Sequence, residues 1–324
     1  MTIRISGTGG ALPDKILTNS ELEKTVDTSD AWIRERTGIG ARHIAQNETV
    51  ASLAAEACRK ALSDAGRNAE DVELILVAST SSEMLLPCIA CQVQSETGAV
   101  NAAAFDINAA CAGFLFALQT ANAYIASGIY RNALVVGAEV LSRIVDWKDR
   151  STCVLFGDGA GAVFAEACDE EGMGIRAMLQ GSDGRRGVVL QCRAGHYTET
   201  DHELFPYKDP FIHMDGSEVY KFAVRTIPEC IEQVLEQAGL KACDIDLYIL
   251  HQANIRIIGS IAKRLGVDED RFPHNLEHVG NTSSAAIPLL LDELNKSGKI
   301  KRGAKLVLSG FGAGLTYGAC VMRW

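Results

Sequence analysis

The sequence has little positive charge, no long apolar run and no secretion signal. Its 324 residues include 31 lysines and arginines against 41 aspartates and glutamates, a net charge of −10. This argues against nucleic acid as the main partner, because phosphate contacts need a basic surface. No apolar stretch approaches the ~20 residues of a membrane-spanning helix, and the first residues, MTIRISGTGGALP, lack the basic-then-apolar pattern of a signal peptide. We therefore expect a cytoplasmic protein that binds neither nucleic acid nor a membrane.

Metal, redox and dinucleotide motifs are also missing. The ten cysteines are irregularly spaced and mostly lie in apolar runs, which suits a reducing compartment better than a disulfide framework. The pair Cys88 and Cys91 has no second pair to complete a zinc site, and no HExxH or GxSxG occurs. Of the glycine-rich segments, 7–12 and 310–315 lack the third glycine of a dinucleotide fingerprint, and no helical pattern follows 157–162. We expect no metal and no other cofactor.

What the sequence does contain is an internal repeat. Residues 65–74 (AGRNAEDVEL) match residues 238–247 (AGLKACDIDL) at an offset of 173 (238 − 65). Each copy follows a helical pattern and leads into an apolar strand, and residues 114–128 similarly resemble residues 284–298 before a second strand. This alternation of helix and strand predicts an α/β protein built from two similar halves, with helices on both faces of its sheets.

We place the boundary between the two halves near residue 170, which gives an N-terminal half of 1–170 and a C-terminal half of 171–324. The segment of roughly 166–217 has acidic, glycine and arginine clusters and weak periodicity. We therefore predict an irregular excursion there, of the kind that often carries substrate contacts. A site in such a duplicated chain is expected where the strand ends of the two halves converge.

Cys111 is the cysteine best placed for chemistry. A strand pattern over residues 102–108 stops just before it, and the run 114–128 that follows is apolar nearly all round, which predicts a buried helix. A cysteine at a helix N-terminus faces unpaired N–H groups and the positive end of the helix dipole, which lower the pKa of its thiol. A buried cysteine that only packs is an equally good interpretation of this local sequence.

Two residues of the C-terminal half fall where the repeat would bring them to the same cleft. His251 ends a strand at the position that matches Ala78 (251 − 173), and Asn281 stands in the counterpart of the Cys111 loop. Their purely structural interpretations are a satisfied strand-end histidine and a helix N-cap. The glycine loop 310–314 offers backbone N–H groups that could form an oxyanion hole.

With these three residues in place, the chain resembles the thiolase superfamily and, within it, the β-ketoacyl-acyl-carrier-protein synthase III family, over essentially its whole length. The motifs that carry the resemblance are TNSELEKTVDTSDAWIRERTGI (18–39), AACAGF (109–114), STCVLFGDGAGAV (151–163), HQANIRI (251–257), GNTSSAAIP (280–288) and GFGAGLTYG (310–318). The resemblance implies a duplicated thiolase-like fold, with two βαβαβ-type halves in a five-layered αβαβα arrangement.

The resemblance also implies an activity. Cys111, His251 and Asn281 match the catalytic residues of the family, and the backbone N–H groups of Cys111 and Ala313 match its oxyanion hole. In the family the cysteine takes an acyl group from an acyl-CoA primer, acetyl-CoA by default. The histidine and asparagine then assist the decarboxylation of malonyl-acyl-carrier-protein, and the carbanion attacks the acyl-cysteine. The resemblance thus implies a decarboxylating acyltransferase that initiates fatty acid synthesis. It also implies that two copies of the chain form a homodimer.

Binding residues are implied by the same motifs. The residues implied to bind coenzyme A are Thr28, Trp32, Arg36 and Arg150, and Thr28 is expected to begin a short helix. In the family, the adenine stacks between the residues that match Trp32 and Arg150. A docking patch for the acidic carrier protein is implied at Lys221, Arg225, Arg256, Lys263 and Arg264. By themselves these residues would suggest only a surface cation–π pair and solvated charges.

The primer and the exact role stay open. Leu86 lies in the implied primer pocket, where many acetyl-specific relatives carry phenylalanine, and its smaller side chain would admit branched or longer primers. One alternative is a specialised ketosynthase or acyltransferase of secondary metabolism with the same three catalytic residues. Another is a catalytically silent paralogue that acts as a scaffold.

Overall fold

The computed structural model describes residues 1–194, 207 and 209–324. Two main sheets form its body, one in the strand order β1–β7–β6–β4–β5 and the other in the order β11–β12–β13–β8. The first sheet consists of β1 (Thr2–Ala11), β4 (Leu74–Ala78), β5 (Ala103–Ile107), β6 (Asn132–Glu139) and β7 (Gly159–Cys168). The second consists of β8 (Gly174–Ser182), β11 (Leu247–Leu250), β12 (Lys305–Gly312) and β13 (Thr316–Arg323).

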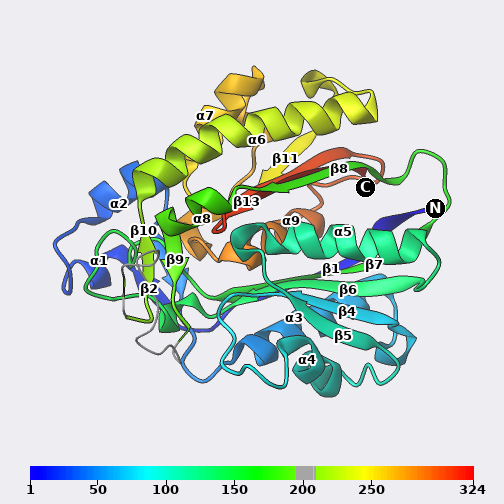
Figure 1. Ribbon diagram of the computed structural model, residues 1–324, viewed down its shortest axis with the longest axis horizontal. Helices are drawn as coiled ribbons and strands as arrows, with labels where there is room; N and C mark the ends of the chain where they lie inside the picture. Colours follow the sequence, from blue (N-terminus) through cyan, green and yellow to red (C-terminus); the bar gives the residue numbers. More distant parts are fainter. Residues whose placement is uncertain (195–206, 208) are drawn as a thin grey trace.

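Helices cover both faces of each sheet, which gives five layers (Figure 1). The outer helices on the first sheet are α3 (Val50–Ala65) and α4 (Ile89–Thr97). The helices between the two sheets are α5 (Gly113–Ala126) and α9 (Ala286–Lys296). The outer helices on the second sheet are α6 (Gly216–Ala238) and α7 (Ile255–Leu265). An apolar cluster fills each helix layer. Along β4, Leu76 joins the central cluster and Val77 the outer one, because alternate residues of a strand face opposite sides. The predicted αβαβα thiolase-like fold is confirmed.

The sequence repeat is also a structural repeat with the same offset. β4 and β11 begin 173 residues apart (247 − 74), as do β6 and β12 (305 − 132) and the central helices α5 and α9 (286 − 113). The outer helices α3 and α6 also end 173 residues apart (238 − 65). Each of them stops at a glycine with positive φ, Gly66 or Gly239, a conformation that costs glycine little.

The segment 166–217 is more regular than we predicted. It contains β8, a full strand that pairs antiparallel with β13 along Gly174–Ser182. β8 is the edge strand of its sheet and most of its side chains stay partly exposed, so its sequence, GIRAMLQGS, lacks the continuous apolar run of the buried strands. After β8 the chain forms a small antiparallel pair, β9 (Leu190–Cys192) and β10 (Ile212–Met214). The prediction for residues 195–206 lies outside the described residues.

The remaining short elements are β2 (Ile16–Thr18), β3 (Ala41–His43), α1 (Asn19–Leu22), α2 (Asp30–Thr37) and α8 (Leu276–Val279). Of these, α1, α2 and β2 lie on the left of Figure 1. Helix α2 begins at Asp30, with Ser29 as its N-cap, and not at Thr28 as we predicted. Among the described helices, none combines the length and the apolar character needed to cross a membrane.

The two halves meet backbone to backbone where strands carry glycine. A Cβ atom added to Gly137 of β6 would overlap the carbonyl oxygen of Ser284, at the start of the α9 segment, and one on Gly161 of β7 would lie 2.5 Å from the backbone nitrogen of Leu289. No side chain fits in either place. Glycine at both positions therefore allows the central helix α9 to lie directly on the first sheet.

We expect Gly137→Ala to lower the thermal stability of the protein. Overpacking a core costs ~1–3 kcal/mol, and here the clash is with backbone that cannot rotate away. Gly184→Ala is the matched control, because a Cβ atom there meets nothing within 4 Å. Thermal unfolding followed by circular dichroism should give a lower midpoint for Gly137→Ala alone. Equal midpoints for the two variants would contradict this contact between the halves.

Candidate active site

Cys111 lies in a strained turn between β5 and α5. The turn is a short 3-10 segment, Ala110–Ala112, in which Ala110 has a φ of 48°. This left-handed conformation costs a non-glycine residue about 1–3 kcal/mol and is typical of functional sites. α5 then begins at Gly113 without a capping side chain, and the Gly113 N–H donates to the carbonyl oxygen of Ala110 in the preceding 3-10 turn. The sulfur therefore belongs to a residue at the positive end of a buried helix, as the sequence predicted.

His251 follows β11 and packs against the same strand, β12, that contacts Cys111. Its backbone N–H donates to the carbonyl oxygen of Ser309 at 2.8 Å, and a Cβ atom added to Gly310 would lie 3.2 Å from the Cβ atom of His251. Two residues further along, a Cβ atom added to Gly312 would lie 2.5 Å from the backbone nitrogen of Cys111. Positions 310 and 312 face the same side of the strand, so one face of β12 holds both His251 and Cys111.

Asn281 comes from the turn that precedes α9. Its backbone N–H donates to Leu155 at 2.9 Å, and its carbonyl accepts from Gly157 at 3.0 Å. The side-chain oxygen Oδ1 accepts from the backbone N–H of Ser283 at 2.9 Å, which leaves the NH₂ group as the end that can meet a substrate. The interpretation of Asn281 as the N-cap of the following helix is wrong, because Ala285 occupies that position in α9.

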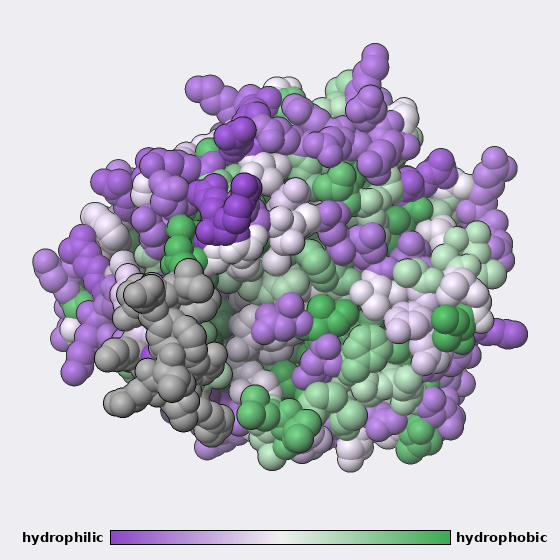
Figure 2. Space-filling model, viewed as in Figure 1, coloured by the Kyte–Doolittle hydropathy of each residue, from purple (hydrophilic) through white to green (hydrophobic). Residues whose placement is uncertain are grey.

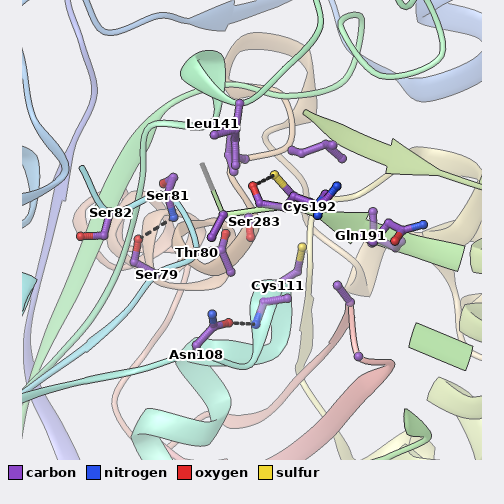
Figure 3. A pocket seen from close by; sticks show the side chains of 18 of the residues that line it. Ser79, Thr80, Ser81, Ser82, Asn108, Cys111, Leu141, Gln191, Cys192 and Ser283 are labelled. Carbon is purple, nitrogen blue, oxygen red and sulfur yellow. Dashed lines mark hydrogen bonds between the residues drawn. The ribbon is translucent and has the colours of Figure 1, made fainter. Parts of the chain in front are cut away.

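Cys111 opens onto a cavity of about 1010 Å³ (Figure 3). Other residues of its wall include Ser79, Ser81, Leu141, Ile144, Ser283 and Ala313. Ala313 and Cys111, whose backbone N–H groups are predicted to form the oxyanion hole, both line this cavity. His251 and Asn281 do not line it; they are only 3% and 5% exposed. They lie behind the wall: His251 packs on the strand that contacts the Cys111 turn, and Asn281 is hydrogen-bonded to Ser283, which lines the cavity.

Burial decides the charge of the two titratable groups at this site. Desolvation raises the pKa of the Cys111 thiol to about 12, against a weaker opposing hydrogen bond from Ser283. It lowers the pKa of the His251 imidazole to about 3. Our expectation of a lowered thiol pKa is therefore wrong for the resting protein, because a helix terminus contributes at most ~2 kcal/mol, or about 1.5 pKa units. At neutral pH the thiol and the imidazole are both uncharged.

The residues predicted to bind coenzyme A lie outside the cavity, and two of them are already stacked. The Arg150 guanidinium lies over the Trp32 ring, 4.6 Å from its centroid, and donates to the carbonyl oxygen of Asp27 at 2.7 Å. The hydroxyl oxygen of Thr28 is buried without a partner among the described residues, whereas Arg36 is exposed. An adenine could enter between the tryptophan and the arginine only if the guanidinium moved.

The five basic residues predicted to dock a carrier protein lie on the adjacent outer helices α6 and α7. Hydrophilic residues dominate the surface over these helices at the top of Figure 2. Three of the five are in ion pairs: Lys221 with Glu218, and Arg225 and Arg264 with Glu229. The other two, Arg256 and Lys263, are exposed and have no ion pair among the described residues. Exposed pairs contribute at most ~1 kcal/mol, so a ligand can displace them.

Leu86 belongs to an exposed apolar loop beside the cavity. It is 82% exposed, and its neighbours Leu85 and Met84 are 76% and 49% exposed. Met84 and Leu85 line the cavity, but Leu86 does not. Leu86 therefore does not close the cavity of its own chain, and three consecutive exposed apolar residues are typical of an interaction surface.

Sequence reasoning missed three polar residues at the site, Glu139, Ser283 and Ser284. Ser284 is the repeat counterpart of Cys111 (284 − 111 = 173). Ser283 has a φ of 51°, close to that of its counterpart Ala110. The constant offset of the repeat could have located this second turn, because both halves bend the chain in the same way before a central helix.

Comparisons with known proteins agree with this geometry. Residues 105–184 match the family model of 3-oxoacyl-[acyl-carrier-protein] synthase III, and residues 235–324 match that of its C-terminal part. A β-ketoacyl-[acyl-carrier-protein] synthase III of Clostridium acetobutylicum is 50% identical over 100% of this chain and 99% of its own. The crystal structure of a 3-oxoacyl-[acyl-carrier-protein] synthase III from Aquifex aeolicus has a TM-score of 0.93 at 43% identity, covering 99% of this chain and 100% of that one.

A priming β-ketosynthase from a polyketide biosynthetic pathway is also similar, with a TM-score of 0.93 at 36% identity, covering 99% of this chain and 96% of that one. The fold and the cysteine that faces the cavity define a condensing enzyme of the thiolase type, an acyltransferase. Within that class, this chain belongs to the β-ketoacyl-acyl-carrier-protein synthase III family. The interpretation as a catalytically silent scaffold is therefore not needed.

We expect the Cys111 thiol to react slowly at neutral pH and faster as the pH rises. The thiolate is the nucleophile, and the pKa of the thiol is about 12. Alkylation by iodoacetamide should therefore accelerate about tenfold per pH unit from about pH 7 to 10. Intact mass after timed quenching measures the rate, and Cys111→Ser identifies the signal among the other cysteines. A plateau below about pH 8 would show that the helix terminus outweighs burial.

Proposed function

We propose that this protein initiates fatty acid synthesis by condensing an acyl-CoA primer with malonyl-acyl-carrier-protein through an acyl-Cys111 intermediate. The observation that carries the proposal is the position of Cys111, which faces a large cavity while His251 packs against the same face of β12. Full-length identity of about one half to synthases of this name supports the same activity.

In the first half-reaction the Cys111 sulfur attacks the thioester carbon of the primer. The backbone N–H groups of Cys111 and Ala313 stabilise the negative charge that develops on the carbonyl oxygen. The bond to the coenzyme A sulfur then breaks, and the thiol proton ends on that sulfur. Because the thiol is protonated at rest, its proton must leave the sulfur during the attack.

In the second half-reaction the malonyl thioester loses carbon dioxide. His251 and Asn281 donate hydrogen bonds to the thioester oxygen, which stabilises the enolate that remains. Both are suited to donate, because a neutral imidazole keeps one N–H and the NH₂ group of Asn281 is not used by Ser283. The enolate carbon attacks the acyl-cysteine and the sulfur leaves. Decarboxylation drives the reaction, so we propose no metal and no redox cofactor.

Three binding surfaces complete the proposal. Coenzyme A binds at the Trp32–Arg150 stack, with Thr28 and Arg36 beside it, and the carrier protein docks on the basic residues of α6 and α7. The exposed apolar loop formed by Met84, Leu85 and Leu86 supports a homodimer in which the loop of one copy covers the cavity of the other.

The ten cysteines are all free, which supports a cytoplasmic location.

The similarity to a polyketide priming synthase supports a second candidate function, the priming of a secondary-metabolite pathway. Both functions use the same acyl-cysteine and differ in the primer and the acceptor. Leu86 stands where acetyl-specific relatives carry phenylalanine, and a leucine is compatible with primers larger than acetyl. The primer range therefore separates the two candidates.

We expect acyl-CoA alone to leave a covalent acyl group on Cys111, visible in intact mass and absent from Cys111→Ser. A panel of straight and branched acyl-CoA donors, followed by addition of malonyl-acyl-carrier-protein, measures the primer range. Condensation of acetyl or short branched primers with the malonyl acceptor supports initiation of fatty acid synthesis. Acylation without condensation on this acceptor would favour the secondary-metabolite function instead.

We expect His251→Ala and Asn281→Ala to acylate Cys111 but to condense at least about a hundredfold more slowly, since each removes one donor to the enolate oxygen. Arg225→Ala, on the outer helix α6 and far from this oxygen, is the control for carrier-protein affinity: it should raise KM and leave kcat unchanged. Normal condensation by both active-site variants would refute the roles assigned to His251 and Asn281.

A further inference from the structure

Glu139 is a buried acid beside the cavity that the proposed reaction does not use. It is the last residue of β6 and has no exposed surface. Its carboxyl oxygens are 3.3 Å from the Ser79 hydroxyl, 3.1 Å from the Thr80 N–H nitrogen, 3.2 and 3.3 Å from the Thr80 hydroxyl, 2.6 Å from the Ser81 hydroxyl and 2.8 Å from the Ser284 hydroxyl. Among the described residues no cation pairs with it, so neutral groups alone surround this carboxyl.

The two contacts of the Ser284 hydroxyl lead us to infer that Glu139 is protonated. The Ser284 hydroxyl lies 2.8 Å from Oε1 of Glu139 and 2.9 Å from the carbonyl oxygen of Ala78. A hydroxyl has one proton and a carbonyl can only accept, so both contacts are satisfied when Glu139 donates to Ser284 and Ser284 donates to Ala78. The other oxygen, Oε2, accepts from Ser81, which itself accepts from Val140. Burial raises the pKa of this carboxyl and outweighs the hydrogen bonds from Ser81, Thr80 and Ser284, which lower it.

The repeat shows what this cluster corresponds to in the other half. Ser284 is the counterpart of Cys111 (284 − 111 = 173), and Ala78 is the counterpart of His251 (251 − 78 = 173). Glu139 stands at the counterpart of the glycine that contacts the cysteine turn (312 − 139 = 173). One half of the scaffold therefore carries the nucleophile, whereas the equivalent place in the other half is a closed polar cluster.

This cluster adjoins both parts of the candidate site. The residues after β4 that bond to Glu139, 79–81, line the cavity, and in Figure 3 Thr80 and Ser283 lie between Ser79 and Cys111. On the other side, Ser284 is next to Ser283, whose N–H holds the side-chain oxygen of Asn281. The Glu139 side chain therefore joins the cavity wall of the N-terminal half to the turn that orients Asn281.

We propose that Glu139 is a positioning residue for condensation: in its protonated form it ties residues 79–81 to the Ser283–Ser284 turn and so holds the Asn281 carboxamide toward the substrate. Glu139 touches no reacting atom. This role rests on the proposed function, because condensation is the step that Asn281 serves.

Two substitutions of Glu139 distinguish the effect of its side-chain volume from the effect of its hydrogen bonds on condensation. Glu139→Gln keeps the donor and the acceptor of the protonated acid, so its kcat for condensation should stay within about threefold of the wild-type value. Glu139→Leu keeps the volume but loses the hydrogen bonds, so its kcat should fall at least about tenfold as the turn shifts. In both variants the KM for malonyl-acyl-carrier-protein and the rate of Cys111 acylation should stay within about threefold, which a general loss of structure would not allow.

The pH profile of Cys111 alkylation reports the charge of Glu139, since a negative charge there would raise the pKa of the thiol. With a protonated Glu139, the profile of Glu139→Gln coincides with that of the wild type. The matched control is Asp292→Asn, which alters a buried carboxyl of α9 that does not line the cavity and should change neither the profile nor kcat.

Three results would overturn the proposal: a profile of Glu139→Gln shifted to lower pH, loss of condensation in Glu139→Gln equal to that in Glu139→Leu, or normal condensation by Glu139→Leu. If Glu139→Leu does not fold by circular dichroism, Ser284→Ala replaces it, because it breaks the same link to the turn. A wild-type protein that fails to condense would refute the proposed function instead, and the alkylation profile would still test the protonation of Glu139.

Discussion

The close approach of β12 to the Cys111 turn is the contact on which the rest of the site depends. Gly310 and Gly312 have no side chains, so His251 and the Cys111 backbone both reach the same face of this strand. A Cβ atom at Gly312 would push the Cys111 nitrogen away and separate it from Ala313, the other donor of the proposed oxyanion hole. One strand therefore sets the positions of the nucleophile, the imidazole and the oxyanion donors together.

The same packing explains why the resting site carries no charge. Burial outweighs the helix terminus at Cys111 and leaves His251 as a neutral donor. Both states suit a reaction in which negative charge appears only when a thioester is bound, first on the carbonyl oxygen and later on the enolate. Donors that are fixed in advance and shielded from water stabilise such charge more strongly than they would in solution.

Duplication gave this protein two equivalent turns, and only one of them opens to substrate. Both bend through a non-glycine residue in the left-handed region, Ala110 and Ser283, and both precede a central helix. At the first turn, glycine on the neighbouring strand leaves room for a reactive cysteine. At the second, Glu139 fills the corresponding space and joins Ser284 to the wall of the cavity. The second turn thereby supports Asn281, and the asymmetry of two similar halves produces one site.

The sequence by itself determined the repeat, the alternation of helix and strand and the place of Cys111 at a helix start, and its motifs carried the resemblance that implied the five layers, because all of these can be seen in the order of residues along the chain. It could not show β8, an edge strand without a continuous apolar run, or the pKa of the Cys111 thiol, which depends on residues far away in the chain. The partners of Glu139 were hidden for the same reason. Burial and hydrogen bonding depend on which distant segments become neighbours, and only the tertiary structure decides that.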